Sequence, residues 1–436
     1  MAEHRRVLID GFNLALPRGT GVATYGFNLA LAGRGMDLGV DALYGLRAPF
    51  NRKLREIMFY ESLGGDTPDK PLRWNFGRWR EFSLMVRPKL AREIPVRGNV
   101  ETQQFSHRLP PFDRIFTSSD LFEVAHRHFK RFGQFLPVRL PDPPEIAHWT
   151  YPLPVRLVGA KNIYTLHDLV PLRLPFASLD NKRNYYKLIR TCVRKGDHIC
   201  TVSEASRDDI LRQFPMDPEK ITNTFQAVRL PQRVLDLTEA DVEASLKSIF
   251  HLPHKGYFMF FGAIEPKKNV GRLIEAYLSL ATKTPLVIVG TRAWGSETEL
   301  RLLQRDEVQP LKATFRSIRR IDYLPRQLLM RLVKGARAVA FPSLYEGFGL
   351  PVLEAMMVGT PVLTSNTSSL PEVVGDAAIT VDPYDTAAIA AGLRALDDDA
   401  DLRARLSQAG LERARHFTMD RYQERLSRMY DTVLSR

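Results

Sequence analysis

The sequence is poor in cysteine and has no long apolar run. Its 436 residues include two cysteines, Cys192 and Cys200, which lack metal-ligand spacing, so we expect both to be buried thiols. No run of about 18 apolar residues occurs, which argues against a membrane-spanning helix. The first residues lead directly into the apolar stretch Val7–Ile9 without the core of a signal peptide. We therefore expect a cytoplasmic protein.

The sequence also lacks a zinc-finger, helix-turn-helix or RNA-binding signature, although it is basic. The net charge is +13, and residues 47–140 alone carry 18 Lys or Arg against 10 Asp or Glu. An excess of this kind suggests an anionic partner. Without a recognition motif, we expect no nucleic acid and favour phospholipid head groups or an acidic substrate.

The chain is too long for one ordinary core, so two domains are expected. Strands and helices alternate in two sets, which indicates parallel βαβ units and an α/β protein with two Rossmann-like domains. The expected strands are 7–10, 162–166, 198–202, 257–261, 285–289, 338–341 and 361–364, and the expected helices are 22–31, 182–194, 271–280, 325–333, 353–358 and 419–434. We place the domains at 1–235, with an irregular basic insertion at about 44–154, and at 236–418, before a C-terminal helix in 419–436.

The stretch Phe341–Met356 places a strand end, a Gly-x-Gly turn and a helix start in direct succession. A helix start offers free backbone N–H groups and a positive dipole end, which suit a diphosphate. Gly347 and Gly349 let the backbone approach a ligand closely. Carboxylates accept hydrogen bonds from sugar hydroxyls. Glu346 on the loop and Glu354 in the helix therefore predict a nucleotide sugar, with one carboxylate for the transferred sugar and one for the ribose.

Two further stretches lie where strands end. Lys267 and Lys268 follow the first strand of the second domain, where a lysine can neutralise a diphosphate and stabilise it as it leaves. Taken alone, they would indicate only a solvated turn. His167 ends a strand of the first domain, where it could contact the donor sugar or move a proton; a hydrogen-bonded loop histidine is an equally good interpretation. No Asp-x-Asp motif stands at a strand end, so no metal is expected.

In this order and spacing, the three stretches resemble glycosyltransferase family 4, the retaining enzymes of the GT-B fold, and in particular its mannosyltransferase-type members of surface polysaccharide synthesis. The residues that match the family's motifs are Glu346 and Glu354 (Glu-x7-Glu), Glu265–Asn269 (Glu-Pro-basic-Lys-Asn), His167-Asp168, Val202-Ser203, and the N-terminal Gly19, Gly21, Val22 and Tyr25. The resemblance is specific over residues 257–385, good over 160–210, fair over 7–33 and absent over about 44–150.

The resemblance implies two domains that face each other across a cleft, with the C-terminal helix crossing back onto the first. It implies a retaining, metal-independent hexosyl transfer without a cofactor, from GDP-mannose in preference to UDP-hexose or dTDP-rhamnose, to a glycan or a polyprenyl-diphosphate-linked acceptor. The catalytic residues would be His167, Glu346 and Lys268. The donor site would comprise Gly19, Gly21, Ser203, Lys267, Lys268, Tyr323, Leu324, Glu346, Gly347, Phe348, Gly349, Leu350 and Glu354.

Within that site, the resemblance implies that Glu354 binds the ribose, Lys268 the diphosphate, and Glu346 the donor sugar beside His167. One departure concerns the diphosphate. Many family members carry Arg where this chain has Ala263, so the charge of Lys267 and Lys268 becomes more important.

A catalytically inactive sugar-nucleotide-binding protein of the same fold is the main alternative. The presence of all four key side chains, Glu346, Glu354, Lys268 and His167, argues against it. A nucleotide-sugar epimerase or a phosphorylase would keep the fold and change the chemistry.

The basic region at 44–154 includes an expected amphipathic helix, Arg78–Leu90, in which Trp79 and Phe82 alternate with arginines. Such a helix can lie in a membrane interface without spanning it. For the helix alone, packing of its aromatic face into the core is the favoured interpretation. For the whole region we expect docking on an anionic membrane surface, on the inner face of the cytoplasmic membrane, and a contribution to the acceptor site.

Overall fold

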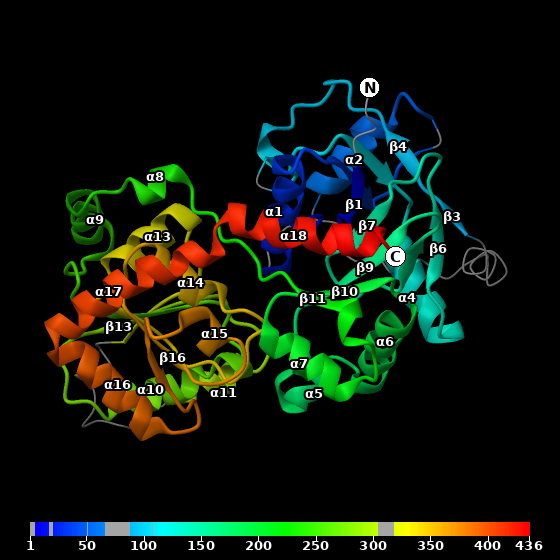
Figure 1. Ribbon diagram of the computed structural model, residues 1–436. Coiled ribbons are helices and arrows are strands. Elements are labelled where there is room, and N and C mark those ends of the chain that lie inside the picture. The colour runs from blue at the N-terminus through cyan, green and yellow to red at the C-terminus, as the bar shows by residue number, and fades with distance from the viewer. Residues whose placement is uncertain (1–4, 17–20, 50, 66–87, 107, 304–317) are drawn as a thin grey trace.

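A computed structural model describes residues 5–16, 21–49, 51–65, 88–106, 108–303 and 318–436. The chain forms two α/β halves joined side by side (Figure 1). The strands of the N-terminal half are β1 (Arg6–Asp10), β2 (Gly39–Tyr44), β3 (Lys89–Leu90), β4 (Arg92–Ile94), β5 (Arg114–Thr117), β6 (Leu136–Arg139), β7 (Ile146–Trp149), β8 (Val155–Leu157), β9 (Lys161–Leu166), β10 (His198–Thr201) and β11 (Ile221–Asn223). Its helices are α1 (Gly21–Gly35), α2 (Arg55–Gly64), α4 (Leu121–Phe132), α5 (Val170–Arg173), α6 (Lys182–Lys195) and α7 (Glu204–Gln213).

The C-terminal half has a shorter set of strands: β12 (Phe258–Phe261), β13 (Leu286–Val289), β14 (Ile318–Ile321), β15 (Ala338–Phe341), β16 (Val362–Ser365) and β17 (Ile379–Val381). The helices after the first half are α8 (Gln232–Leu235), α9 (Glu239–Ser245), α10 (Val270–Leu278), α11 (Ser296–Glu299), α13 (Arg326–Gly335), α14 (Leu350–Met357), α15 (Leu370–Val374), α16 (Thr386–Asp398), α17 (Ala400–Ala414) and α18 (Met419–Leu434). The 3₁₀ helices of this part of the chain include η5 (Pro266–Lys268) and η8 (Arg415–Phe417).

Each half is built on one large sheet. The N-terminal sheet has eight strands in the order β11-β10-β9-β7-β1-β2-β5-β4, and the C-terminal sheet has six in the order β14-β13-β12-β15-β16-β17. The strand pairs of both sheets are parallel except for β4 with β5. Strands such as β12, Phe-Met-Phe-Phe, are apolar and buried at every position, as expected for a parallel sheet covered by helices on both faces.

The segment 44–154 is not an irregular insertion, so this prediction was wrong. It supplies β4, β5 and β7 to the eight-stranded sheet, and β7 pairs with the first strand, β1. Its strands are two to four residues long and contain Arg, Lys, His or Pro, so they lack an extended apolar pattern. The predicted helix Arg78–Leu90 lies mostly outside the described residues, and its last two residues form β3.

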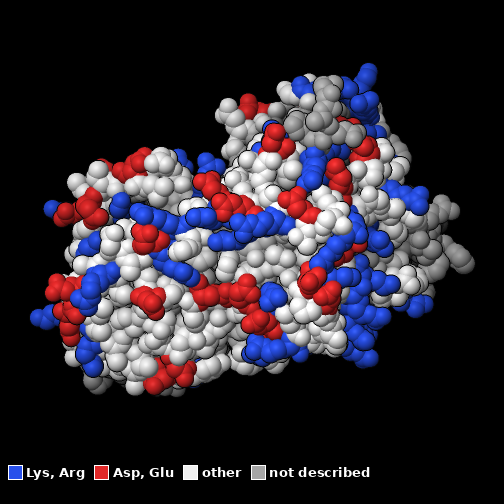
Figure 2. Space-filling view, viewed as in Figure 1, with Lys and Arg blue, Asp and Glu red and all other residues white. Residues whose placement is uncertain are grey.

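The final helix, α18, leaves the C-terminal half and lies against α1 of the N-terminal half (Figure 1). Its exposed face carries Arg421 and Arg428 together with acidic residues (Figure 2). On its buried face, Tyr430 Oη and His148 Nδ1 are 2.8 Å apart, and the Tyr422 ring meets Tyr25 at 6.4 Å. Burial lowers the pKa of His148 to about 3, so this contact is made by a neutral imidazole. The helix therefore anchors the C-terminal end of the chain on the core of the N-terminal half.

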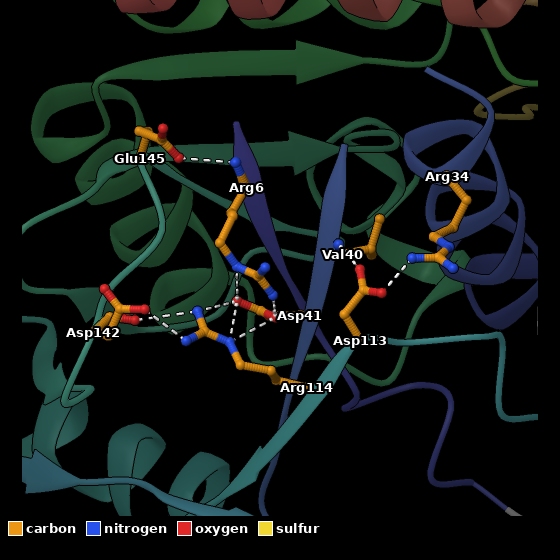
Figure 3. Close-up of polar contacts among 8 residues, drawn as sticks. All are labelled: Arg6, Arg34, Val40, Asp41, Asp113, Arg114, Asp142 and Glu145. Atoms are coloured by element: carbon orange, nitrogen blue, oxygen red, sulfur yellow. Dashed lines mark hydrogen bonds and ion pairs between the residues drawn. The ribbon is translucent and has the colours of Figure 1, made fainter. Parts of the chain in front are cut away.

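A buried ion cluster lies at the amino edge of the N-terminal sheet (Figure 3). Asp41 of β2 is fully buried and accepts hydrogen bonds from Arg6 Nε, at 3.2 Å, and from Arg114 Nη2, at 2.7 Å. Arg114 also pairs with Asp142 at 2.7 Å, and its hydrogen bonds to Asp41 raise its pKa. Because β1, β2 and β5 each contribute one residue, the cluster joins three neighbouring strands at the edge of the sheet opposite their carboxyl ends.

Candidate active site

The loop between β15 and α14 presents Glu346 among polar partners. Its Oε1 accepts hydrogen bonds from Lys268 Nζ and from Ser343 Oγ, each at 2.6 Å. The Glu346 backbone is held as well, because its N–H donates to Ser368 Oγ at 3.0 Å and its carbonyl accepts from Ser369 Oγ at 2.9 Å. Burial alone would raise the pKa of Glu346, but Lys268 and Lys267 lower it below its ordinary value. The carboxylate is therefore ionised and fixed in place.

Lys267 and Lys268 sit on η5, directly after β12. Lys267 is 3.7 Å from Glu265, and Lys268 also lies over the Phe341 ring at 5.0 Å. Burial would lower the pKa of Lys267, but Glu346 and neighbouring carboxylates raise it well above its ordinary value. Both lysines are thus cations held at the carboxyl end of a parallel sheet, where α/β proteins bind ligands.

Gly347 brings the two halves into contact. A Cβ placed on it would lie 2.6 Å from the carbonyl oxygen of His167 in the other half, closer than a side chain can approach. Gly349 has a φ of 104° and precedes α14, a conformation that glycine adopts without strain. Gly21 lies at the same junction, because a Cβ there would meet Leu350 at 3.6 Å. The glycine turn of the motif therefore serves close packing between the halves.

His167 follows β9 and is held by the backbone of the loop after β7. Its Nε2 donates to the carbonyl of Thr150 at 2.8 Å, and the Thr150 N–H in turn donates to Asp10 at 2.5 Å. The edge of the Tyr25 ring meets the imidazole at 4.9 Å. Burial lowers the pKa of His167. A neutral ring whose Nε2 carries the proton has Nδ1 as its acceptor.

A cleft of about 460 Å³ opens at this junction. Its lining includes His167 and Asp168 from the N-terminal half and Glu265 and Lys267 from the C-terminal half. Sequence reasoning missed other lining residues, namely Asp168 as a site residue, Tyr151 and Trp294. Tyr151 follows β7 and could have been found from the rule that ligands bind beyond the carboxyl ends of strands, had that short strand been recognised.

Glu354 lies in α14 and is only 6% exposed. Its Oε1 accepts a hydrogen bond from Arg326 Nη2 at 2.8 Å. Arg326 is the first residue of α13, and its side chain is 44% exposed. Sequence reasoning did not identify Arg326, and no motif marks it.

The remaining predicted donor-site residues have different environments. Ser203 is the buried N-cap of α7 and accepts from Ser206 N at 3.1 Å. Phe348 packs against Phe417 with ring centres 5.5 Å apart. Leu324 is half-buried, but Tyr323 is 73% exposed on the loop after β14, so the structure does not gather Tyr323 with the others. Gly19 lies outside the described residues.

No group of three or more His, Cys, Asp or Glu side chains in the described part of the chain could hold a metal ion. None of the helices in the described ranges is long and apolar enough to cross a membrane.

Similarity to known proteins identifies the family of this chain. Residues 242–413 match the family model for glycosyl transferases group 1. The O-antigen chain mannosyltransferase B of Escherichia coli is 35% identical over 280 residues, which cover 62% of this chain and 69% of that protein. The chain belongs to the group 1 glycosyltransferases. Another relative of this glycosyltransferase, the serotype-specific mannosyltransferase WbdA of Escherichia coli, is 29% identical over 263 residues, 58% of this chain but only 31% of that protein.

The solved structures define the fold of this glycosyltransferase. The crystal structure of Anabaena HepE in complex with UDP and glucose superposes with a TM-score of 0.66 and 13% identity, over 98% of this chain and 100% of that chain. The two parallel sheets are accordingly the two Rossmann-like domains of the GT-B fold. The predicted fold class is confirmed.

Proposed function

We propose that this glycosyltransferase is a retaining member of glycosyltransferase family 4 that transfers mannose from GDP-mannose to a saccharide acceptor in polysaccharide biosynthesis. The observation that carries the proposal is the approach of Gly347 to His167 across the cleft. It brings an ionised carboxylate and two lysines of one half to an imidazole of the other. The names of the two Escherichia coli relatives support mannose as the transferred sugar.

In the proposed reaction, Lys267 and Lys268 bind the diphosphate and stabilise its charge as it leaves, in place of a metal ion. The two contacts that Glu346 makes with Lys268 and Ser343 both use Oε1, so Oε2 would accept a hydroxyl of the donor sugar. Glu354 would accept the ribose hydroxyls.

The chemical step follows from retention. The bond between the anomeric carbon and the diphosphate oxygen breaks, and the acceptor oxygen bonds to that carbon on the same face. The acceptor proton passes to the departing diphosphate oxygen. His167 Nδ1 would contact the reacting sugar, because Nε2 is already engaged by Thr150.

A panel of nucleotide sugars tests the donor. GDP-mannose at 100 times its Kd should raise the free energy of unfolding by about 2.7 kcal/mol, whereas UDP-glucose and dTDP-rhamnose should not. Stabilisation by UDP-glucose alone would reassign the donor to the UDP-hexose alternative. Stabilisation with no transfer to any acceptor would favour the inactive binding protein.

Stereochemistry and metal dependence test the mechanism. An α-linked donor should give an α-linked product by NMR, and activity should be unchanged in EDTA. A β-linked product, or a strict need for Mg²⁺ or Mn²⁺, would contradict this mechanism.

We also propose that the enzyme works at the inner face of the cytoplasmic membrane. The basic residues of the 44–154 segment support this, because each one near an anionic surface adds about 1 kcal/mol of attraction. Flotation should show binding to vesicles that contain anionic lipid, weakening with salt. Absence of binding at low salt would remove the membrane from the proposal.

A further inference from the structure

A second hollow opens beside the cleft, between α4 and α6 of the N-terminal half. Its volume is about 600 Å³. Tyr151, Pro152, Asp180 and Tyr185 line both this groove and the cleft, so the two adjoin. Tyr185 Oη also donates to the carbonyl of Asp168 at 2.9 Å, which fixes the wall that they share. A molecule bound in the cleft can therefore continue into the groove.

The walls of the groove are strongly basic. Lys130 and Arg131 come from the last turn of α4, and Lys187, Arg190 and Arg194 come from α6. Figure 2 shows Lys and Arg gathered over this corner of the molecule. Asp180 is the only carboxylate in the lining. Within the described part of the chain, none of the five cations makes a salt bridge, in contrast to Lys267 of the cleft, which pairs with Glu265.

The floor of the groove is apolar. Phe129 and Leu188 line it and are 9% and 8% exposed. In the adjoining cleft, Leu179 is 75% exposed. An apolar floor between cationic walls fits an amphiphile that carries a phosphate group better than it fits a neutral saccharide.

One face of α6 runs along the whole groove. Its lining residues begin at Asn181, at the helix start beside the cleft, and end at Arg194 in the last turn. At about 1.5 Å per residue this face is about 20 Å long. The groove is thus long enough to hold the part of an acceptor that lies behind its reacting sugar.

We propose that the α4–α6 groove binds the phosphate or diphosphate that joins the acceptor saccharide to a hydrocarbon carrier. The inference rests on the proposed function, since it takes the cleft as the place of transfer. It assigns Lys187, Arg190 and Arg194 to acceptor recognition, in a part of the chain where no motif marked an acceptor site. The cations line a hollow, so they can converge on one anionic group, which a flat membrane surface would not require.

Binding of a short prenyl diphosphate tests the assignment independently of turnover. Geranyl diphosphate, with geraniol as its neutral counterpart, is titrated into the enzyme with and without saturating GDP. The variant Lys187→Gln/Arg190→Gln should weaken geranyl diphosphate binding by at least about tenfold, because two charge-assisted contacts are lost. Lys130→Gln/Arg131→Gln, on the opposite wall, should act in the same direction.

The matched control is Arg183→Gln/Lys195→Gln, which removes two exposed cations from the same helix outside the groove lining. It should leave binding within about twofold of wild type. Equal loss in the control, or equal binding of geraniol and geranyl diphosphate, would overturn the proposal. So would groove variants that lose binding to phosphatidylglycerol vesicles but keep geranyl diphosphate, since the groove would then be a membrane-docking surface.

The failure of the donor assignment gives a different result. If GDP-mannose neither binds nor serves as donor, the titrations without GDP still report on the groove. Loss of geranyl diphosphate binding in the groove variants alone would support the groove even then.

Discussion

The two halves of the enzyme hold their charged groups in different ways. Beyond the carboxyl ends of its strands, the C-terminal half pairs each key carboxylate with a cation, Glu346 with Lys268 and Glu354 with Arg326. The N-terminal half pairs Asp41 at the far edge of its sheet, but among the described residues the cations of the α4–α6 groove have no ion pairs. The C-terminal side of the cleft is therefore assembled before a ligand arrives, whereas the groove has charge available for one.

The two halves also shift the pKa values of their buried carboxyl groups in opposite directions. Lysines hold the pKa of Glu346 below its ordinary value, while burial raises the pKa of Asp10 to about 6. Asp10 is linked to His167 through the backbone of Thr150. The pH dependence of the cleft near neutrality should therefore come from the N-terminal half.

Replacing Glu346 by Gln should have the largest effect. The variant keeps the shape of the side chain but leaves Lys268 without its counter-charge and the donor sugar without a charged acceptor. We expect kcat to fall by at least about 100-fold, as when a positioned electrostatic group is removed. Steady-state kinetics measure this fall in kcat, with the donor that the panel of nucleotide sugars identifies. Near-normal kcat would show that the paired carboxylate is structural.

Replacing Asp10 by Asn should change stability with pH. The folded state raises the pKa of Asp10 to about 6, so it holds this proton more tightly than the unfolded chain does. Wild type should thus lose stability as the pH rises from about 4 to about 6, whereas the variant has no such group. Between these two pH values, the free energy of unfolding of the variant should rise by about 3 kcal/mol relative to that of wild type. Denaturant unfolding at several pH values measures this, and parallel curves would contradict it.

Replacing Glu354 by Ala should weaken nucleoside diphosphate binding by roughly 1.5–3 kcal/mol, the value of a charged hydrogen-bond acceptor. Isothermal titration with GDP measures the loss. A 2′,3′-dideoxy nucleotide is the control, because it lacks the hydroxyls and should bind both proteins alike. Unchanged GDP affinity would remove Glu354 from the donor site.

Replacing Gly347 by Ala tests the contact between the halves. The new methyl would lie 2.6 Å from the His167 carbonyl oxygen, so the loop or the other half must shift, at about 1–3 kcal/mol. Gly21→Ala is the matched control at the same junction, because its methyl meets Leu350 at an ordinary 3.6 Å. The midpoint of thermal unfolding should fall for the first variant only. Equal behaviour of the two would mean that the halves do not close as described.

The composition of each strand governed what could be predicted from the sequence. Apolar strands such as β12 and β13 were found within one residue, whereas β14, in which Arg319 and Arg320 interrupt the apolar pattern, was missed. β7 was missed because its buried strand includes His148, whose polarity is hidden by hydrogen bonds to Tyr430 and Thr165. Such a strand resembles a loop until its partners are known.

Site residues differ in the same respect, because local contacts can be predicted from the sequence and long-range contacts cannot. The N-cap contact of Ser203 with Ser206 joins residues three positions apart, so it is within reach of local sequence patterns. The contact of Gly347 with His167 and the pairing of Arg326 with Glu354 could not be predicted. Both join residues that are distant in the sequence and are brought together only by the assembled fold.

The path of α18 has a mechanical consequence. The chain passes between the halves twice, once after β11 near Phe225 and once between η8 and α18, at Phe417. A rotation of one half relative to the other would therefore take place about the line that joins the two crossings. Phe348 lies against both, 6.5 Å from the Phe225 ring and 5.5 Å from the Phe417 ring. Through Phe348, the loop that carries Glu346 packs against both crossings, so a rotation of the halves would displace this loop.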